Sequence, residues 1–468
     1  MRAISPSTSA VDNAIAFTAP EYQADGSIRP ASYTFSGSTT SGWQILREGQ
    51  PHLRLGAGYR PLAVSHCGIC STDLARRHLP FPLPQVTGHE VVARDENGAA
   101  FVVEINASHV ARGLPAAAWC TTCRAGLPTH CPDRLVLGIH DLPGGFGPWL
   151  LAPLEAVHPV PAGLDPVTAT LVEPFAAALA AVRALPLTEI DRVLVLGPGR
   201  LGSLLVAALA AWRRRTGGRY VIAAAGRRPQ ALARARALGA DEATPVDRAT
   251  SADIVVDATG SPTGLELAVR LARREVHVKS TSGLPTSGLR HLTALVVDEV
   301  ALVPWEPGQT LPGGATSVLA LDAPMAVRHA LARAGLQLVE AADTPRLPLG
   351  GADLAVATTC AAVDAILRPH PCVERGWIRP RGTILLARGS VAADGLVAAL
   401  RERGLRLGST RCGDLRAALE LLVDPSLTPA LGAHLVTAFV PASELAEGFA
   451  RAAREGGKVI VTQPGALV

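Results

Sequence analysis

The sequence lacks two kinds of segment that would identify particular partners. No dense block of basic residues occurs, and 44 Lys and Arg against 40 Asp and Glu leave a formal net charge of +4. This balance gives no reason to expect a nucleic-acid partner. No long hydrophobic run occurs either, because the most apolar stretch, residues 171–182, is short and contains Glu173 and Pro174. We therefore expect no membrane span.

A secretion signal and a disulfide framework are also lacking. The N-terminus has no basic head followed by an apolar run and a cleavage site, so we expect a cytoplasmic protein. Five of the eight cysteines lie between Cys67 and Cys131. Cysteines clustered with two-residue gaps are more typical of metal binding than of disulfides, and this usage fits a reducing compartment. The only lysines are Lys279 and Lys458, which we attribute to genome composition.

The chain does contain enough apolar sequence for several folded cores. Hydrophobic residues make up 48% and charged residues 18%, which argues against a disordered chain. At roughly 150 residues per domain, the chain length of 468 residues predicts two to four domains. Short β-like runs broken by Gly and Pro occupy residues 53–158 and predict a small barrel or sandwich. From about residue 166 strands alternate with helices, which predicts an α/β fold with helices on both faces of a parallel sheet.

The α/β part contains an internal repeat. Three segments recur about one hundred residues later in the same order: 220–240, 252–260 and 275–283 correspond to 317–337, 352–360 and 382–390. The order of strand, helix and strand is the same in both copies. This agreement favours a partial tandem duplication over chance similarity between Ala-rich βα units.

These patterns divide the chain into five predicted parts. Residues 1–48 are rich in Ser, Thr, Ala and Gly without a sustained period, and we expect a partly ordered lead-in there. The β-rich domain covers 49–165, and a nucleotide-binding domain covers 166–306. Residues 307–407 hold the second copy of the repeat, and 408–468 return to the first two domains.

A glycine-rich loop follows the first strand of the α/β part. In RVLVLGPGRLG, Gly197, Gly199 and Gly202 lie between an apolar strand and a helix. The first glycine allows a tight turn, the second lets the backbone approach a pyrophosphate, and the third lets helix and strand pack closely. Free N–H groups at the helix N-terminus would bind the phosphates. We predict a dinucleotide site here, with Arg200 and Leu201 as further contacts.

The turn after the next strand bears on the choice of cofactor. NAD usually meets an Asp or Glu there, but this chain has Arg227 and Arg228. Guanidinium groups make paired hydrogen bonds to a phosphate, so we predict a preference for NADP(H) over NAD(H). The alternative is that both arginines are only solvated. Thr259, which follows the DIVVDA strand, is a further predicted cofactor contact.

Two short motifs in the β-rich part contain residue types that bind zinc. They are HCGICSTDL around Cys70 and GHEVV around His89. A thiolate and an imidazole are ligands that zinc accepts, and Glu90 and Glu173 offer oxygen ligands. A catalytic zinc keeps one open position and lowers the pKa of a coordinated hydroxyl. We expect Cys67, although it is three residues before Cys70, to be a packed thiol without metal.

Four motifs occur along the chain in this order: CGICSTD, GHE, an EP dipeptide that opens a helix, and LGPGRLG. With these motifs the sequence resembles the zinc-dependent medium-chain dehydrogenase/reductase family. The resemblance covers about residues 50–305 and 408–468. It implies a GroES-like barrel domain that carries catalytic zinc and a Rossmann domain that binds a nicotinamide cofactor. By motif position it assigns the zinc ligands Cys70 and His89, a third ligand Glu90 or Glu173, the proton-relay hydroxyl Thr72 and the loop-supporting acid Asp73.

The first departure from the family concerns a second, structural zinc. Family members often bind it with four cysteines, and the last three ligand positions are present: Cys120, Cys123 and Cys131. Ala117 stands at the first position. Because a closed zinc site needs four ligands, either His109 or His130 completes the site, or the lobe holds no metal.

The second departure is the insertion at 307–407. The family-like stretch 292–303 would ordinarily continue directly into 408–422. The inserted copy has no glycine-rich loop, so we expect no second dinucleotide, and we take Asp322 at a strand end as a coincidence. Family members usually associate through the edge of the Rossmann sheet. The insertion is therefore expected to extend that sheet or to alter a homodimer interface.

The resemblance implies a zinc-dependent dehydrogenase that transfers a hydride between an alcohol or polyol, or the matching carbonyl, and a nicotinamide cofactor. Two alternatives stay open. One is a carbonyl or alkene reductase that needs no zinc, which would keep its activity after chelation. The other is a non-catalytic binding or regulatory protein on a decayed dehydrogenase scaffold, which would show no nicotinamide binding in a titration.

Overall fold

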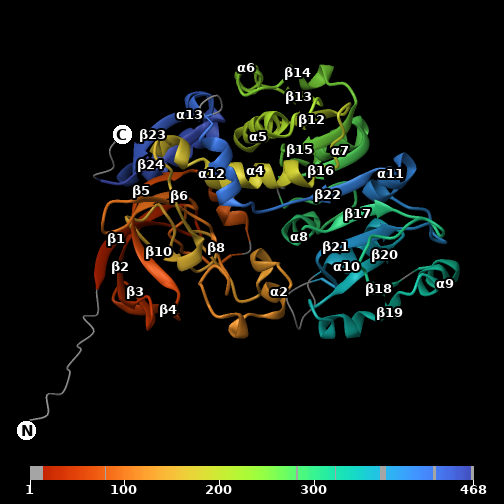
Figure 1. The fold of residues 1–468 in the computed structure, drawn as a ribbon, viewed down its shortest axis with the longest axis horizontal. Helices are drawn as coiled ribbons and strands as arrows, with labels where there is room; N and C mark the ends of the chain where they lie inside the picture. Colours follow the sequence, from red (N-terminus) through yellow and green to blue (C-terminus); the bar gives the residue numbers. More distant parts are fainter. Residues whose placement is uncertain are drawn as a thin grey trace, which may run out of the picture. The chain divides into compact units, whose positions relative to one another are not determined.

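The computed structural model of the protein describes residues 14–79, 81–280, 283–321, 323–368, 376–424 and 428–464. The chain forms two compact units (Figure 1). The first consists of Met1–Val160, Ala438–Arg451 and Val459–Val468, and the second of Pro161–Thr437 and Ala452–Lys458. Among the described residues, every helix is too short or too polar to cross a membrane.

The first unit begins with a four-stranded antiparallel sheet, β1 to β4 in chain order. Its strands are β1 Ile15–Tyr22, β2 Ile28–Ser38, β3 Gly42–Arg47 and β4 Gln50–Leu55. Alternate residues such as Tyr33 and Phe35 are buried, and the buried Glu21 accepts a hydrogen bond of 2.7 Å from Arg47 Nη2. The lead-in therefore forms regular β-structure from residue 15 onward. The sequence signal was weak because Ser, Thr and Pro interrupt the alternation of these strands.

The second sheet of this unit has the order β11-β7-β6-β5-β24-β23, with β10 also paired to β5. Its strands are β5 Tyr59–Gly68, β6 Glu90–Arg94, β7 Ala100–Val103, β10 Trp149–Pro153, β11 Val157–Pro159, β23 Val436–Pro441 and β24 Lys458–Thr462. Smaller elements are α1 Ser71–Leu74, α2 Thr121–Arg124, β8 Asn106–Ala107, β9 Leu135–Val136 and α14 Leu445–Glu455. Because β24 pairs with β5, the C-terminal segment completes the sheet that carries the predicted metal motifs.

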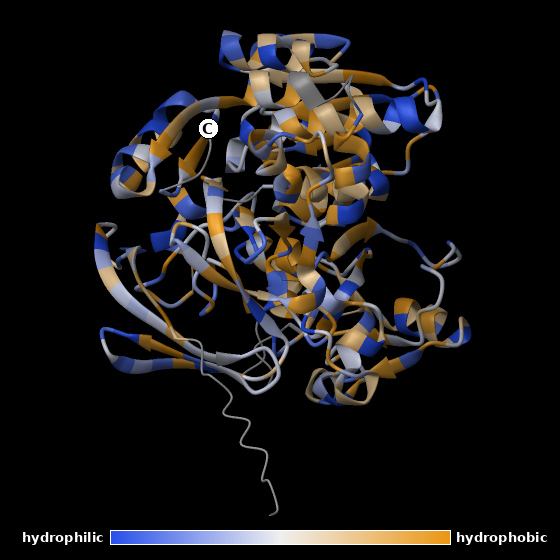
Figure 2. Ribbon diagram, turned by 60° about the vertical axis from the view of Figure 1, so that its left-hand side comes forward, coloured by the Kyte–Doolittle hydropathy of each residue, from blue (hydrophilic) through white to orange (hydrophobic). Residues whose placement is uncertain are grey.

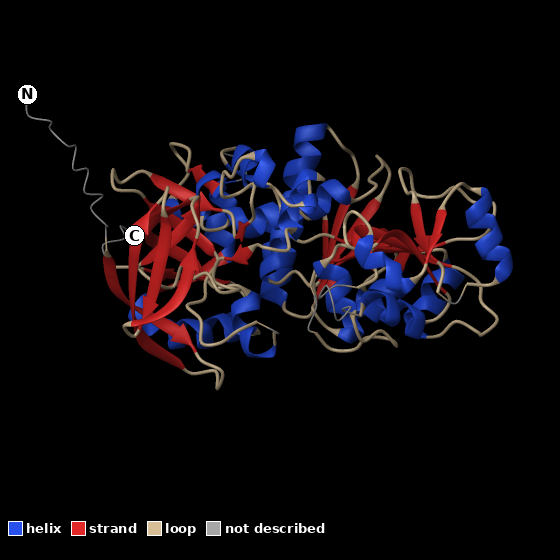
Figure 3. Ribbon diagram, turned by 90° about the horizontal axis from the view of Figure 1, so that it is seen from below, coloured by secondary structure: helices blue, strands red, loops and turns tan. Residues whose placement is uncertain are grey.

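The second unit is built on an eleven-stranded sheet with helices on both faces (Figure 3). One half has the order β14-β13-β12-β15-β16-β22, and these strands are all parallel. They are β12 Arg192–Leu196, β13 Val221–Gly226, β14 Glu242–Pro245, β15 Ala252–Asp257, β16 Ala272–Val278 and β22 Arg406–Ser409. The helices around them are α3 Pro166–Ala169, α4 Val172–Ala184, α5 Arg200–Thr216, α6 Pro229–Ala237, α7 Pro262–Leu271, α12 Leu415–Leu422 and α13 Thr428–Leu435. We call this part the first half of the sheet.

The second half of the sheet has the order β17-β21-β20-β18-β19. Its strands are β17 Ala301–Pro304, β18 Ser317–Leu319, β19 Gln337–Val339, β20 Ala352–Ala357 and β21 Ile378–Leu386. Its helices are α8 Leu292–Val297, α9 Met325–Arg333, α10 Cys360–Leu367 and α11 Gly395–Arg403. The strands are parallel to one another, but β17 meets β22 antiparallel, with Leu302 opposite Leu407. The strands are largely coloured as hydrophobic in Figure 2, as expected where both faces are covered.

The two halves share details that a chance likeness between βα units would not give. Asp253 Oδ2 accepts a hydrogen bond of 2.8 Å from the N–H of Arg192, at the start of β12. Asp353, one hundred residues later, accepts one of 3.1 Å from the N–H of Ser317, at the start of β18. Both β15 and β20 also shift register against their neighbour after their first residue. The predicted fold class, a GroES-like domain and a Rossmann sheet with an inserted partial repeat, is confirmed.

These contacts correct one part of the expected repeat. The segment at 317–337 does not correspond to 220–240, because β18 lies between β19 and β20 as β12 lies between β13 and β15. The similarity of one βα unit to another does not reveal its neighbours in the sheet. Asp322, predicted at a strand end in the inserted copy, lies outside the described residues.

The halves also exchange their last strands. Strand β17 follows β16 along the chain but pairs with β21, whereas β22 follows β21 but pairs with β16. The insertion therefore both extends the sheet and returns a strand to the first half. One apolar core cluster includes residues of both halves, among them Val276, Leu302, Ile384 and Leu407.

Candidate active site

The structure brings together three side chains that could bind a metal in the first unit. Cys70 lies just after β5, and His89 and Glu90 lie at the start of β6, the neighbour of β5. One potential ligand atom of each lies within 4.8 Å of the others. Gly68 is needed opposite Glu90, since a Cβ there would lie 2.2 Å from Glu90 Oε2. This donor set, one sulfur, one nitrogen and one oxygen, suits zinc.

Asp73 connects the two segments that carry Cys70 and His89. Its buried carboxylate accepts hydrogen bonds from the N–H of Cys70, at 2.8 Å, and from the N–H of Gly88, at 3.2 Å. Asp73 Oδ1 also lies 3.6 Å from His89 Nδ1. A carboxylate behind a histidine ligand fixes the orientation of the ring. The predicted relay residue Thr72 lies on the same turn, with its Oγ1 3.7 Å from Cys70 Sγ.

The electrostatics of this cluster favour a bound cation. Burial by itself would lower the pKa of His89, but the negative charges of Asp73 and Cys70 raise it well above its usual value. His89 Nδ1 is buried and lies beyond hydrogen-bond distance of any partner among the described residues. The same negative surroundings would attract a divalent metal ion, which would have to displace the proton because only the neutral imidazole is a ligand.

A second cluster lies in the lobe around α2. His109 joins the three cysteines of the predicted structural site: Cys120, Cys123 and Cys131. His109 Nδ1 lies 3.6 Å from Cys131 Sγ and 3.9 Å from Cys123 Sγ, and the four potential ligand atoms all lie within 4.8 Å of one another. His130 is not in the cluster. His109 thus supplies the fourth potential ligand that position 117 lacks, and its Nε2 lies 3.5 Å from Asp133 Oδ2.

The glycine-rich loop has the geometry its sequence predicts. Gly197 has φ of +83°, and a Cβ there would lie 2.9 Å from Thr259 Cγ2. A Cβ on Gly202 would lie 2.2 Å from the carbonyl oxygen of Gly197. A Cβ on Gly199 would have no neighbour within 4 Å among the described residues, so the backbone here is open to a ligand. Gly199 is the N-cap of α5, and because glycine has no side chain it cannot cap the first N–H groups of this helix, which are the groups that bind phosphates in such loops.

The other predicted cofactor residues lie around this loop. Arg200 and Leu201 begin α5, and Arg227 and Arg228 are exposed in the turn between β13 and α6. Thr259 donates hydrogen bonds to Asp257 Oδ1 from its N–H, at 2.9 Å, and from its hydroxyl, at 2.7 Å. Burial raises the pKa of Asp257 to about 6.

More arginines gather beside the turn after β13 than the sequence motif indicates. Arg234 Nη1 donates to the carbonyl of Gly456, at 3.2 Å, and Arg200 Nη1 donates to the carbonyl of Ala452, at 2.6 Å. A Cβ on Gly456 would lie 2.4 Å from Arg228 Nη1. Burial and the charge of Arg200 lower the pKa of Arg234. These guanidinium groups come from segments far apart in sequence, so motif reading found only the adjacent pair.

Glu173, the other predicted oxygen ligand, belongs to the second unit, in the first turn of α4. The structure therefore places Cys70, His89 and Glu90 together and assigns Glu173 to a separate unit. Sequence reasoning missed Asp133, which supports His109, because no motif links residues 24 positions apart.

Comparison with known protein families gives a match in the first unit. Residues 57–162 match the family described as the alcohol dehydrogenase GroES-like domain. The chain is 30% identical over 146 residues to the L-galactonate-5-dehydrogenase of Escherichia coli strain K12, covering 30% of this chain and 42% of that protein. It is 34% identical over 158 residues to the 2-dehydro-3-deoxy-L-galactonate 5-dehydrogenase of Pseudoalteromonas atlantica, covering 32% and 46%. The matched part thus spans less than half the length of these relatives.

Solved structures match over a larger part of the chain. The L-idonate 5-dehydrogenase of Escherichia coli K-12 has a TM-score of 0.58 at 14% identity, covering 96% of this chain and 99% of that one. A chain called a short chain alcohol dehydrogenase, from Escherichia coli CFT073 and in complex with NADH, has a TM-score of 0.57 at 16% identity, covering 96% and 99%. Residues 57–162 therefore match the alcohol dehydrogenase GroES-like domain family, and the fold of the chain is similar to that of these solved dehydrogenase structures.

Proposed function

We propose that the protein is a zinc-dependent oxidoreductase that transfers a hydride between an alcohol or polyol, or the matching carbonyl, and a nicotinamide cofactor. The cluster of Cys70, His89 and Glu90 carries this proposal. A chain that also has an open phosphate-type glycine loop combines the two parts that such a reaction needs. Neither the metal-free reductase nor the non-catalytic binding protein would require both the metal cluster and the glycine loop.

Each proposed site residue has a separate task. Cys70 and His89 would hold the zinc, with Glu90 or Glu173 as the third ligand, and bound zinc would act as a Lewis acid on the substrate oxygen. Asp73 keeps the imidazole in its orientation. Thr72 would accept the proton of the substrate hydroxyl and pass it on.

The glycine loop sets the position of the cofactor along the sheet. Its N–H groups would bind the pyrophosphate, with the adenosine over β12, β13 and β14. The nicotinamide would then lie over the carboxyl ends of β15, β16 and β22, since a dinucleotide occupies both mononucleotide halves of such a sheet.

The test combines metal analysis with a substrate screen. Purified protein is assayed with alcohols, polyols, amino alcohols and aldehydes while nicotinamide absorbance is followed, before and after treatment with a chelator. We expect activity that disappears on chelation and returns with zinc. Activity that survives complete zinc removal would indicate the metal-free reductase, and failure of the wild-type protein to bind any nicotinamide dinucleotide would indicate the binding protein.

We also propose a preference for NADP(H). Arg227 and Arg228, with Arg234 nearby, supply positive charge where a ribose-binding acid would favour NAD. Replacing both turn arginines by Ala is expected to lower kcat/KM for NADP(H) roughly tenfold, with little change for NAD(H). A wild-type enzyme that prefers NAD(H) would contradict this proposal.

We further propose that His109 completes a second zinc site with the three cysteines. Three sulfurs and one nitrogen form a closed structural set, and Asp133 supports the imidazole. Metal analysis should give close to two zinc ions per chain, and His109→Ala should reduce this to one. No disulfide joins the seven cysteines of the described residues, which is consistent with the proposed cytoplasmic, reducing setting.

The inserted half bears on association between copies of the chain. Strand β22 is the last strand of the first half, and β17 of the second half lies beside it, so β22 is not a free edge. We propose that a homodimer of the usual family type cannot form through this edge. Light scattering on the purified protein tests this, and a dimer that dissociates when β22 is mutated would contradict it.

A further inference from the structure

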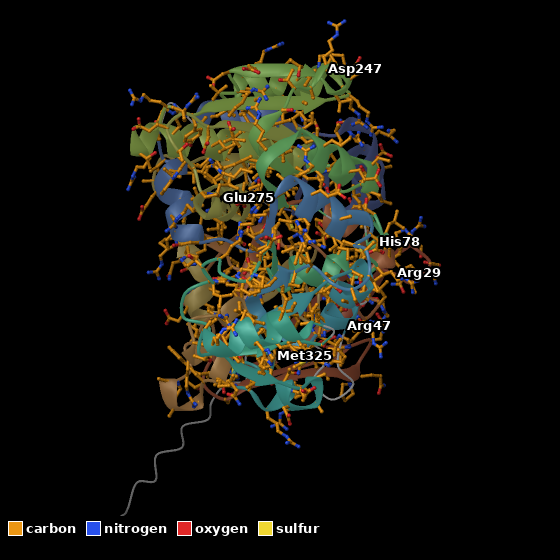
Figure 4. All side chains as sticks on the ribbon, turned by 90° about the vertical axis from the view of Figure 1, so that its right-hand side faces the viewer. Arg29, Arg47, His78, Asp247, Glu275 and Met325 are labelled. Carbon is orange, nitrogen blue, oxygen red and sulfur yellow. The ribbon has the colours of Figure 1, made fainter. Side chains whose placement is uncertain are left out.

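Strand β16 carries a row of buried polar side chains on one face. Glu275, His277 and Lys279 alternate with Val276 and Val278, and the exposed fractions of the three polar residues are 1%, 1% and 7%. A strand covered on both faces normally buries apolar side chains on each side. Burying charged groups is costly unless they are paired, so this row needs an explanation. Figure 4 labels Glu275 among the side chains.

The row is linked from end to end through the loop after β22. Lys279 Nζ donates to the carbonyls of Thr410 and Arg411, both at 2.8 Å, and to Thr410 Oγ1, at 3.2 Å. The same hydroxyl lies 3.1 Å from His277 Nε2. His277 Nδ1 lies 3.7 Å from Glu275 Oε1, which accepts a hydrogen bond of 2.7 Å from Arg406 Nη1.

The second half of the sheet shows that the fold does not require this row. Val278 pairs with Asp257 at the end of β15, and Leu386 pairs with Ala357 at the end of β20. The residues equivalent to the row are therefore Thr383, Leu385 and Ala387. Leu385 and Ala387 are fully buried in an apolar cluster. Only the half with the glycine-rich loop has the charged row, so we attribute the row to ligand binding.

The row ends where the nicotinamide part of a dinucleotide would lie. Lys279 directly follows β16, and its N–H donates to the carbonyl of Asp257, at 2.9 Å. Burial lowers the pKa of Lys279 to about 8, while Cys412, Glu299 and Glu173 act in the opposite direction. The side chain is therefore mostly charged at neutral pH.

We propose that Lys279 is a positioning residue that fixes the loop 410–412 beside the nicotinamide and makes this end of the site favour the reduced, uncharged ring over the oxidised, cationic ring. This inference rests on the proposed function. A fixed ammonium repels the oxidised ring and leaves the reduced ring almost unaffected, and the effect persists at the low dielectric of a closed site. Glu275, at the other end of the row, offsets part of this repulsion.

The test measures dissociation constants for NADPH and NADP⁺ at pH 7, with the melting temperature of each variant. In Lys279→Met, the preference for the reduced cofactor should fall about fivefold. In Glu275→Gln, it should rise about twofold, because a compensating negative charge is removed. Thr383→Val, at the position equivalent to Glu275 in the second half, should leave the preference unchanged.

The opposite signs separate this role from a purely structural one. Lower melting temperatures with an unchanged preference in both row variants would overturn the inference while leaving the proposed function intact. If Lys279→Met does not fold, the rise expected for Glu275→Gln decides the question alone. A wild-type protein that binds neither cofactor would overturn the proposed function and this inference together.

Discussion

The two halves of the eleven-stranded sheet share a framework and differ at the carboxyl edge, where we propose that the cofactor binds. In both halves an aspartate accepts a backbone hydrogen bond: Asp253 from the start of β12, and Asp353 from the start of β18. Both halves also have a register shift, after the first residue of β15 and of β20. At the carboxyl edge, the first half has the glycine-rich loop and the second half continues from β18 into a helix that Pro324 caps.

This comparison separates what the fold requires from what a ligand requires. The hydrogen bonds at the amino edge recur because each half must hold its first strand against β15 or β20. The glycines and the buried charges occur once, so neither is needed to build the sheet. The second half of the sheet thus serves as an internal reference for the first half, because both belong to the same molecule.

The largest expected effect concerns the glycine-rich loop. Gly199→Val should weaken dinucleotide binding roughly a hundredfold, because the side chain would occupy the position that the pyrophosphate needs. The melting temperature should hardly change, since no atom lies within 4 Å of the added Cβ and the backbone φ is negative. Ala323→Val, in the corresponding turn of the second half, is the matched control and should leave binding unchanged. Equal losses in both variants would contradict the assignment.

A second prediction applies the same distinction to the two metal clusters of the first unit. Cys70→Ser should lower activity roughly a hundredfold or more and remove one zinc, with a small change in stability. His109→Ala should also remove one zinc, but it should mainly lower the melting temperature, because a closed site contributes folding free energy. Metal content, activity and melting temperature of both variants check this. Loss of activity without loss of zinc in Cys70→Ser would contradict the ligand role.

A smaller effect, on the free energy of unfolding, is expected at the two equivalent aspartates, Asp253 and Asp353. Burial by itself would raise the pKa of Asp353, but hydrogen bonds from Thr316, Arg379 and Ser317 lower it to about 2. Asp353→Ala should therefore lower the free energy of unfolding at neutral pH by about 2 kcal/mol. Asp253→Ala should cost about 1 kcal/mol, because its arginine partner Arg273 is more distant, at 3.5 Å. Urea unfolding measures both costs.

The pH dependence follows from the sign of the shift at Asp353. The folded-state pKa is lower than the unfolded one, so this stabilisation is present above about pH 4 and is lost as the pH falls toward 2. The difference between wild type and Asp353→Ala should shrink over that range. A constant difference down to pH 2 would mean that the carboxylate is not stabilised as described.

The sequence predicted those features that depend on neighbouring residues. The glycine-rich loop and the zinc-type motifs around Cys70 and His89 are local, because a few consecutive residues determine each turn. His109 could be named only as one of two candidates, since its place beside the cysteines depends on how the lobe folds.

Features that depend on pairing between distant strands were not predictable. The strand at 317–319 could be recognised as a strand, but its place between β19 and β20 is set by contacts with residues far along the chain. The alternation EVHVK likewise predicts a strand, although periodicity does not reveal that its polar face is buried.

The exchange of β17 and β22 has a consequence for biosynthesis. A nascent chain that has emerged only as far as residue 305 contains five strands of the first half but not the sixth, which arrives with residues 406–409. The second sheet of the first unit is completed even later, because β24 at 458–462 must pair with β5. Neither unit can close on the ribosome before most of the chain has been translated, so chaperones have a long interval in which to engage the incomplete edges.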